Sequence, residues 1–143
     1  MSANTVAAAR TAAPAARLTT LRRLLALDAV VTGGNGLAYL ALAGPLGDLL
    51  GAATATLVDI GAFLLVYGLA VGVLASRRQP PVLAVRAVID ANLVWPVLSL
   101  VAMELWLEPT TAGLVWIPLQ AATVLGFAVL QFAALRKVRE AGR

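Results

Sequence analysis

The stretch that decides the fold reads RRLLALDAVVTGGNGLAYLALAG, residues 22–44. Two arginines precede an apolar run of about 20 residues, and a helix of that length rises far enough to span the ~30 Å hydrocarbon core of a bilayer. The only charged side chain inside the run is Asp28. A run of this length and polarity predicts a membrane-spanning helix over residues 24–44.

Three further apolar runs follow, and each predicts another membrane span. The connections between them are short, which forces neighbouring helices to be antiparallel. The first connection, Gly44–Asp48, contains Gly and Pro and is expected to break the first helix. We therefore expect an all-α integral membrane four-helix bundle with up-down-up-down topology. Its spans are predicted at residues 24–44, 54–75, 82–103 and 111–134.

These spans make up one transmembrane domain, residues 21–136. It is flanked by a mobile N-terminal tail at residues 1–20 and a C-terminal tail at residues 137–143. The N-terminal stretch also resembles a signal peptide, with Ala41-Leu42-Ala43 as its cleavage site, and cleavage would leave three spans. We favour retention, because the apolar stretch is longer than that of a usual signal peptide and contains Asp28.

The overall composition indicates lipid as the solvent of this chain. Apolar residues make up 61% and charged residues 13% of the 143 residues, and the mean hydropathy is +0.90. A soluble domain of this size has too little interior to bury so much apolar surface. The chain has no Cys and no His, which excludes disulfides, thiolate or imidazole metal ligands and catalysis by either residue. We expect no enzymatic activity, no cofactor and no metal site.

Positive charges are confined to one side of the predicted bundle. The two tails, the residues that join them to the first and last spans (21–23 and 135–136) and the turn at residues 76–81 hold all of the 11 Lys and Arg residues except Arg86, which lies one turn inside the membrane from the same side. The charged side chains in the connections on the opposite side are all acidic. Since Lys and Arg stay on the cytoplasmic side, we expect both termini in the cytoplasm. The pI near 10.7 then reflects topology and not nucleic-acid binding.

Charged side chains inside the spans are costly unless they are paired or hydrated. Arg86 and Asp90 are four residues apart, a pairing distance on a helix, and Asp28 opens the polar face of the first span. We expect these three residues to form an ionic cluster in the cytoplasmic half of the bilayer, with Arg86 between the two carboxylates. The candidate intramembrane polar cluster is completed by three amides near mid-bilayer: Asn35, Asn92 and Gln120.

Polar residues also recur along single helix faces. Thr32, Asn35 and Tyr39 follow Asp28 on one face of the first span, and Gln120 and Gln131 share a face of the fourth. Amides in such columns are either hydrogen-bond links between helices or parts of a site.

The glycines have two interpretations. Gly33-Gly34-Asn35-Gly36 either unwinds the first span, as in the discontinuous helices of transporters, or allows close helix packing. Gly68 and Gly72 form a GxxxG pattern. Their face is our candidate contact for a homo-oligomer or a larger membrane complex.

The segment Leu27–Tyr39, LDAVVTGGNGLAY, resembles small four-helix integral membrane proteins of high-GC bacteria. The preference for Arg over Lys is similar as well. The resemblance covers most of residues 21–136 and implies the four-helix architecture and an inner-membrane location. It implies no activity.

The sequence leaves three functions open. The first is a structural or accessory subunit of a larger membrane assembly, which the short connections favour. The second is a small oligomeric ion- or proton-coupled transporter or channel that uses Asp28 or Asp90. The third is a protein that binds anionic lipids through its basic rim. We favour the first because it requires the least of the chain.

Overall fold

The computed structural model describes the backbone of residues 3–142 and the side chains of residues 15–142. In that part of the chain every regular element is a helix, and four of the helices are long and apolar enough to cross a membrane. The expected all-helical membrane architecture is confirmed to this extent. The helices are α1 (Ala3–Ala41), α2 (Ala43–Leu50), α3 (Thr54–Ser76), α4 (Val82–Leu105) and α5 (Thr111–Ala141).

The helix boundaries differ from the prediction at both ends of the chain and in the first connection. From Ala3 onward the expected N-terminal tail is continuous with α1, while residues 1–2 lie outside the described part. At the other end α5 continues to Ala141. The first helix does break, but at Leu42, two residues before the predicted segment, and residues 44–48 themselves form part of α2. Pro45 is tolerated there because the backbone N–H groups of a first helical turn need no partner within the helix.

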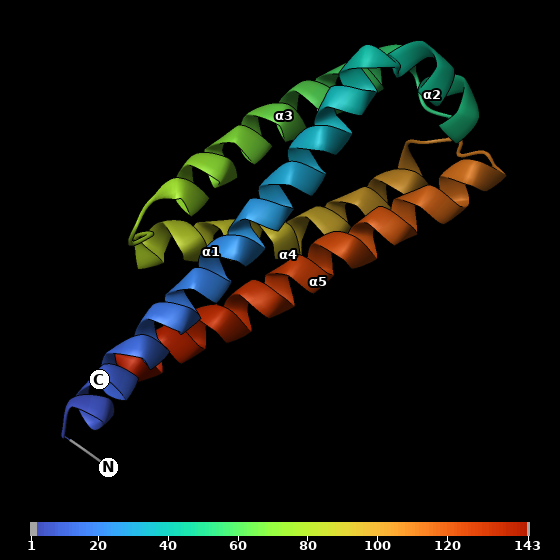
Figure 1. Cartoon of the computed structure of the whole chain (residues 1–143). Helices are drawn as coiled ribbons and strands as arrows, with labels where there is room; N and C mark the ends of the chain where they lie inside the picture. The colour runs from blue at the N-terminus through green and yellow to red at the C-terminus, as the bar shows by residue number, and fades with distance from the viewer. Residues whose placement is uncertain (1–2, 143) are drawn as a thin grey trace.

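The spanning helices form two pairs, shown in Figure 1. α1 packs along α3, α4 packs along α5, and the two pairs meet mainly where α1 contacts α5. α3 and α4 follow each other in the chain but make few contacts beyond the turn that joins them. The start of α1 and the end of α5 lie at the same end of the bundle.

Glycines allow α1 and α3 to approach closely. A Cβ atom at Gly68 would lie 2.7 Å from the Cα atom of Gly33, and a Cβ atom at Gly36 would lie 2.6 Å from the backbone nitrogen of Leu65. α1 is unbroken through Gly33–Gly36, so these glycines do not unwind the helix, and Gly36 serves its close packing against α3. The face of Gly68 that we expected to contact a partner is occupied by α1 of the same chain.

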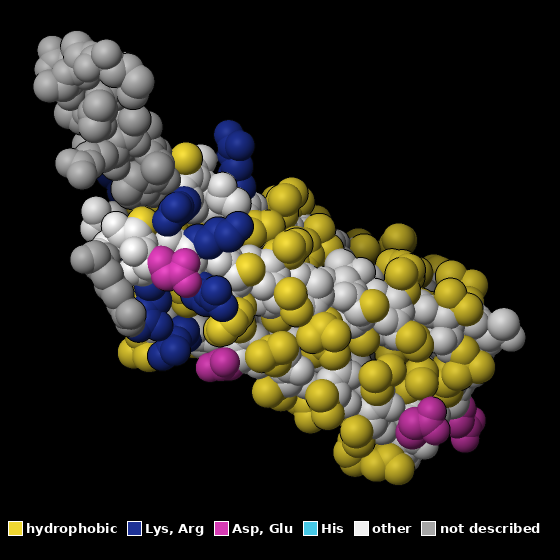
Figure 2. Space-filling model, turned by 90° about the horizontal axis from the view of Figure 1, so that it is seen from below, with side chains coloured by type: hydrophobic (Ala, Val, Ile, Leu, Met, Phe, Trp, Pro, Cys, Tyr) yellow, Lys and Arg dark blue, Asp and Glu magenta, His cyan; other side chains and the backbone are white. Residues whose placement is uncertain are grey.

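The two ends of the bundle differ in charge (Figure 2). Lys and Arg side chains gather at one end, which we call the basic end, and the opposite, acidic end carries Asp and Glu side chains. Between the two ends, apolar side chains cover the surface, with Leu83 81% and Val30 72% exposed. An exterior of this kind is suited to contact with lipid chains.

Specific hydrogen bonds close both ends of the bundle. At the basic end, Arg22 donates from Nε to the carbonyl oxygen of Ala75 at 2.9 Å and from a terminal nitrogen to that of Ser76 at 3.3 Å. A cation at this position also favours the C-terminus of α3. At the acidic end, the backbone nitrogen of Thr110 donates to the carbonyl oxygen of Leu50 at 3.2 Å, which ties the start of α5 to α2.

Candidate functional site

A network of hydrogen bonds surrounds Asp28, whose side chain is fully buried. Its Oδ1 accepts from Thr32 Oγ1 at 3.0 Å. Its Oδ2 accepts from Asn92 Nδ2 at 2.6 Å and from Gln131 Nε2 at 2.8 Å. The Tyr67 hydroxyl donates to Asn92 Oδ1 at 3.0 Å. These five residues, the Asp28 network, come from α1, α3, α4 and α5, so every spanning helix contributes at least one side chain.

The hydrogen bonds of the network converge on the Asp28 carboxyl group. Its two oxygen atoms are bonded to two side-chain amide nitrogens, which can only donate, and to one hydroxyl group. Among the described residues, Asp28 forms no salt bridge; the salt bridge found there joins Arg136 and Glu140 at the exposed end of α5. Hydrogen bonds to an anion are about twice as strong as neutral ones, so three of them offset part of the cost of burying the charge. The side-chain dipoles of the network take the place of a counter-ion.

Arg86 and Asp90 do not belong to this network. Both are exposed on α4, and in the part of the chain that the structure describes neither forms a salt bridge. The structure therefore does not form the predicted ionic cluster with Asp28. The buried residue of this helix is Asn92, two positions after Asp90 and six after Arg86. Residues two or six positions apart point to roughly opposite sides of a helix, so burial of Asn92 turns both charges outward.

Gln131 is the network amide that the sequence analysis did not include in the candidate intramembrane polar cluster. It lies 11 residues after Gln120, three helical turns along the same face of α5. The polar column on the fourth span was therefore the signal that could have found it. The column also contains Thr123, which is exposed in the structure. A position on the same helix face was therefore not enough to tell which polar residues of the column are buried.

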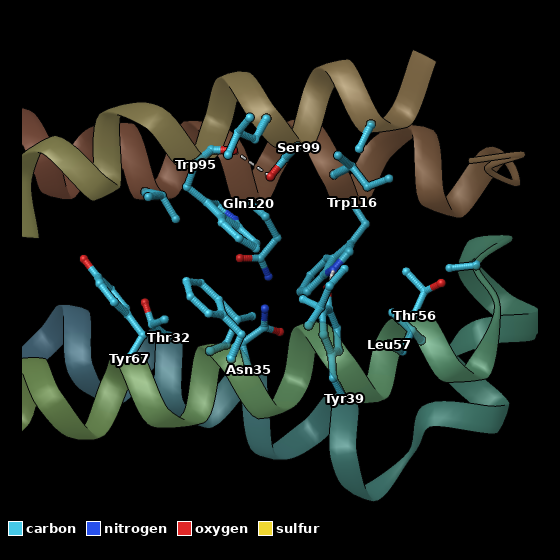
Figure 3. A pocket seen from close by; sticks show the side chains of 18 of the residues that line it. Thr32, Asn35, Tyr39, Thr56, Leu57, Tyr67, Trp95, Ser99, Trp116 and Gln120 are labelled. Atoms are coloured by element: carbon cyan, nitrogen blue, oxygen red, sulfur yellow. Dashed lines mark hydrogen bonds between the residues drawn. The ribbon is translucent and has the colours of Figure 1, made fainter. Parts of the chain in front are cut away.

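A cavity of about 260 Å³ lies between the two helix pairs, where α3 and α4 diverge. Figure 3 shows its lining side chains, which come from all four spanning helices and are mostly apolar or aromatic. The ring of Phe63 on α3 stacks on that of Trp95 on α4, with centroids 5.4 Å apart. Tyr67 and Asn92 also line the cavity. The Asp28 network thus forms one end of it.

Two amide groups point into the cavity from opposite sides. Asn35 on α1 and Gln120 on α5 face each other, with their amide nitrogen atoms turned inward (Figure 3). In the described part of the chain no buried side-chain nitrogen or oxygen atom lacks a partner, so the unpaired amide groups are open to the cavity. Further toward the acidic end, Trp116 Nε1 donates to the Tyr39 hydroxyl at 2.7 Å. This bond joins α5 to α1 and leaves Asn35 and Gln120 as the free polar groups between them.

Among the described residues there is no group of three His, Cys, Asp or Glu side chains that could hold a metal ion. Comparison of the chain with known protein families, with curated proteins and with solved structures finds no match. We therefore take two features as the candidates for function: the Asp28 network and the cavity that it adjoins.

The network predicts which charged residue the fold needs. Asp28→Leu leaves the donors of Thr32, Asn92 and Gln131 without their acceptor. At roughly 0.6 kcal/mol for an intramembrane hydrogen bond, we expect a loss of about 2 kcal/mol in the free energy of unfolding. Titration of the purified protein with SDS in mixed micelles measures this loss.

The matched control is Asp90→Leu, the same substitution at an exposed position of α4. Asp90→Leu and Arg86→Ala, each made as a single variant, should each change the free energy of unfolding by less than about 0.5 kcal/mol, as is usual for surface positions. Equal losses for Asp28→Leu and Asp90→Leu, or a larger loss for Arg86→Ala, would contradict the assignment of the network.

Proposed function

We propose that this protein binds a lipid-soluble small molecule in the cavity between α3 and α4. The observation that carries the proposal is the cavity itself, with its apolar and aromatic wall and a few inward-facing polar groups. This is the usual composition of a small-molecule site. The volume of about 260 Å³ is close to the lower limit of roughly 300 Å³ for such sites. It therefore suits a head group better than a complete lipid.

The surroundings of the cavity support entry from the bilayer. Two of its lining residues, Phe63 on α3 and Leu98 on α4, are 53% and 56% exposed. The cavity wall therefore reaches the outer surface between these helices. A molecule dissolved in the lipid chains would meet this opening without crossing the aqueous phase.

The geometry is less favourable to transport through Asp28 or Asp90, and it does not require a partner subunit. Both carboxylate oxygens of Asp28 are occupied by donors, which leaves little capacity to bind an ion directly, and Asp90 is exposed. Contact with lipid alone accounts for the apolar exterior, so that exterior does not require a partner subunit. Ligand binding is the function that uses this cavity, which residues of all four spanning helices line.

We also propose that the basic end faces the cytoplasm and that the protein resides in the inner membrane, with both termini cytoplasmic. The support is the distribution of charge: Arg77 and Arg78 lie in the turn between α3 and α4, whereas Asp48, Glu104 and Glu108 lie in and beside α2 and the α4–α5 connection at the opposite end. Positive charge is retained on the cytoplasmic side during insertion.

Photo-labelling tests the cavity. An uncharged alkyl diazirine incorporated into nanodiscs should label cavity-lining segments of α3 and α4 in the wild-type protein, as mapped by peptide mass spectrometry. Ser99→Phe should reduce that labelling to the level of the lipid-facing surface, because the ring fills the space beside Trp95.

The matched control for this experiment is Thr123→Phe on α5. Ser99 and Thr123 each donate a hydrogen bond to the carbonyl oxygen four residues earlier, at 2.8 and 2.9 Å, but Thr123 is exposed outside the cavity. Thr123→Phe should leave the labelling pattern unchanged. Uniform labelling around the wild-type bundle, or no response to Ser99→Phe, would refute binding in the cavity.

Cysteine accessibility tests the orientation. The chain has no Cys, so a single Cys can be placed without removing others. A membrane-impermeant maleimide added to intact cells should label Asp48→Cys and Glu108→Cys but not Gln79→Cys. Labelling of Gln79→Cys from outside would reverse the proposed orientation.

A further inference from the structure

The free amide groups of Asn35 and Gln120 indicate the chemistry of the ligand. We infer that it carries a neutral hydrogen-bond acceptor of the conjugated carbonyl type, as in a quinone, held between these two amides. Its apolar tail then leaves the cavity between α3 and α4. This inference rests on the proposed function and adds the chemical class of the molecule bound.

The head group must be uncharged. Among the described residues no Asp, Glu, Lys or Arg side chain lines the cavity. The carboxylate nearest to it, Asp28, is screened by Thr32 and Asn92, which line the cavity and donate to both of its oxygen atoms. An ion placed among apolar groups without an opposite charge pays a large desolvation cost. A neutral polar group avoids this cost.

The free polar groups are donors in the observed arrangement. Each amide nitrogen carries two N–H groups, and those of Asn35 and Gln120 face each other. Donors without an acceptor are costly in a dry cavity. One carbonyl oxygen has two lone pairs, so it can accept from α1 and from α5 at the same time. An acceptor oxygen is therefore the group that completes the site.

Several other lining donors are already engaged. The Ser99 hydroxyl donates to the carbonyl oxygen of Trp95 at 2.8 Å, and the Tyr67 hydroxyl donates to Asn92. Trp116 donates to Tyr39. Among the lining amides of the described residues, Asn35 and Gln120 are left free, and they face each other.

The aromatic side of the cavity favours a planar head group. Phe63 stands between two other rings and is nearly parallel to both, at 15° to Trp95 and 17° to Tyr67. Aromatic groups pack against flat conjugated systems in offset stacks. A conjugated carbonyl compound offers both a flat ring and the acceptor oxygen that the amides require.

Two probes of similar shape separate recognition of the head group from simple apolar binding: 2-decyl-1,4-benzoquinone, which has acceptor oxygens, and decylbenzene, which has none. Affinity is obtained from the rise in thermal midpoint of the full-length protein in detergent as each probe is added, since a ligand that binds the folded state stabilises it. The wild-type protein should bind the quinone about tenfold more tightly than decylbenzene, as two net hydrogen bonds allow.

Variants of the two amides assign the effect to the site. Asn35→Leu combined with Gln120→Leu should weaken quinone binding about tenfold and leave decylbenzene binding unchanged. Gln120→Leu alone should show an intermediate loss, and it replaces the double variant if that protein does not fold. Thr123→Leu, a polar-to-apolar change outside the cavity on the same helix, should bind both probes as the wild type does.

The failures are distinguishable. Equal wild-type affinity for both probes, or quinone affinity that survives loss of both amides, would overturn the inference about the head group and leave apolar binding in the cavity intact. No stabilisation by either probe, together with photo-labelling that ignores Ser99→Phe, would overturn the proposed function itself.

Discussion

The buried carboxylate of Asp28 and the three hydrogen bonds that it accepts are the interaction on which this bundle depends. In the hydrocarbon core of a bilayer, a polar group that has lost water must find its partner within the protein. Apolar side chains gain little by exchanging lipid for one another, so they do not strongly select one helix arrangement. A carboxylate that needs donors from α1, α4 and α5 does select one. Tyr67 of α3 extends the same network through Asn92.

The position of the cavity follows from where the helices are joined to one another and where they are not. Glycine packing holds α3 against α1, and α4 lies along α5. The Asp28 network and Arg22 join the helices toward the basic end, and Thr110 joins α2 to α5 at the acidic end. Between these attachments α3 and α4 are bridged mainly by the stacked rings of Phe63 and Trp95. The space beside those rings remains open to a ligand.

The spans could be predicted from the sequence because the thickness of the bilayer limits their length and their apolar character is unambiguous. Parts of the site could be predicted as well, since Asp28, Asn92, Asn35 and Gln120 are polar where polarity is costly. Their partners could not, because periodicity places residues on a face of one helix but does not say which faces meet. When lipid surrounds the bundle, both faces of a helix are apolar, and the inward face is poorly marked. The i,i+4 spacing of Arg86 and Asp90 was therefore mistaken for a buried ion pair.

A double-mutant cycle between Asp28 and Gln131 tests the central claim most directly. These residues are 103 positions apart in the chain, and they are linked by a 2.8 Å hydrogen bond between α1 and α5. The unfolding free energies of Asp28→Leu, Gln131→Leu and the double variant are compared with that of the wild type in mixed micelles. The account predicts a coupling energy of about 0.6 to 1.7 kcal/mol, the range for hydrogen bonds between membrane helices. Strict additivity, within the roughly 0.3 kcal/mol found for independent sites, would contradict it.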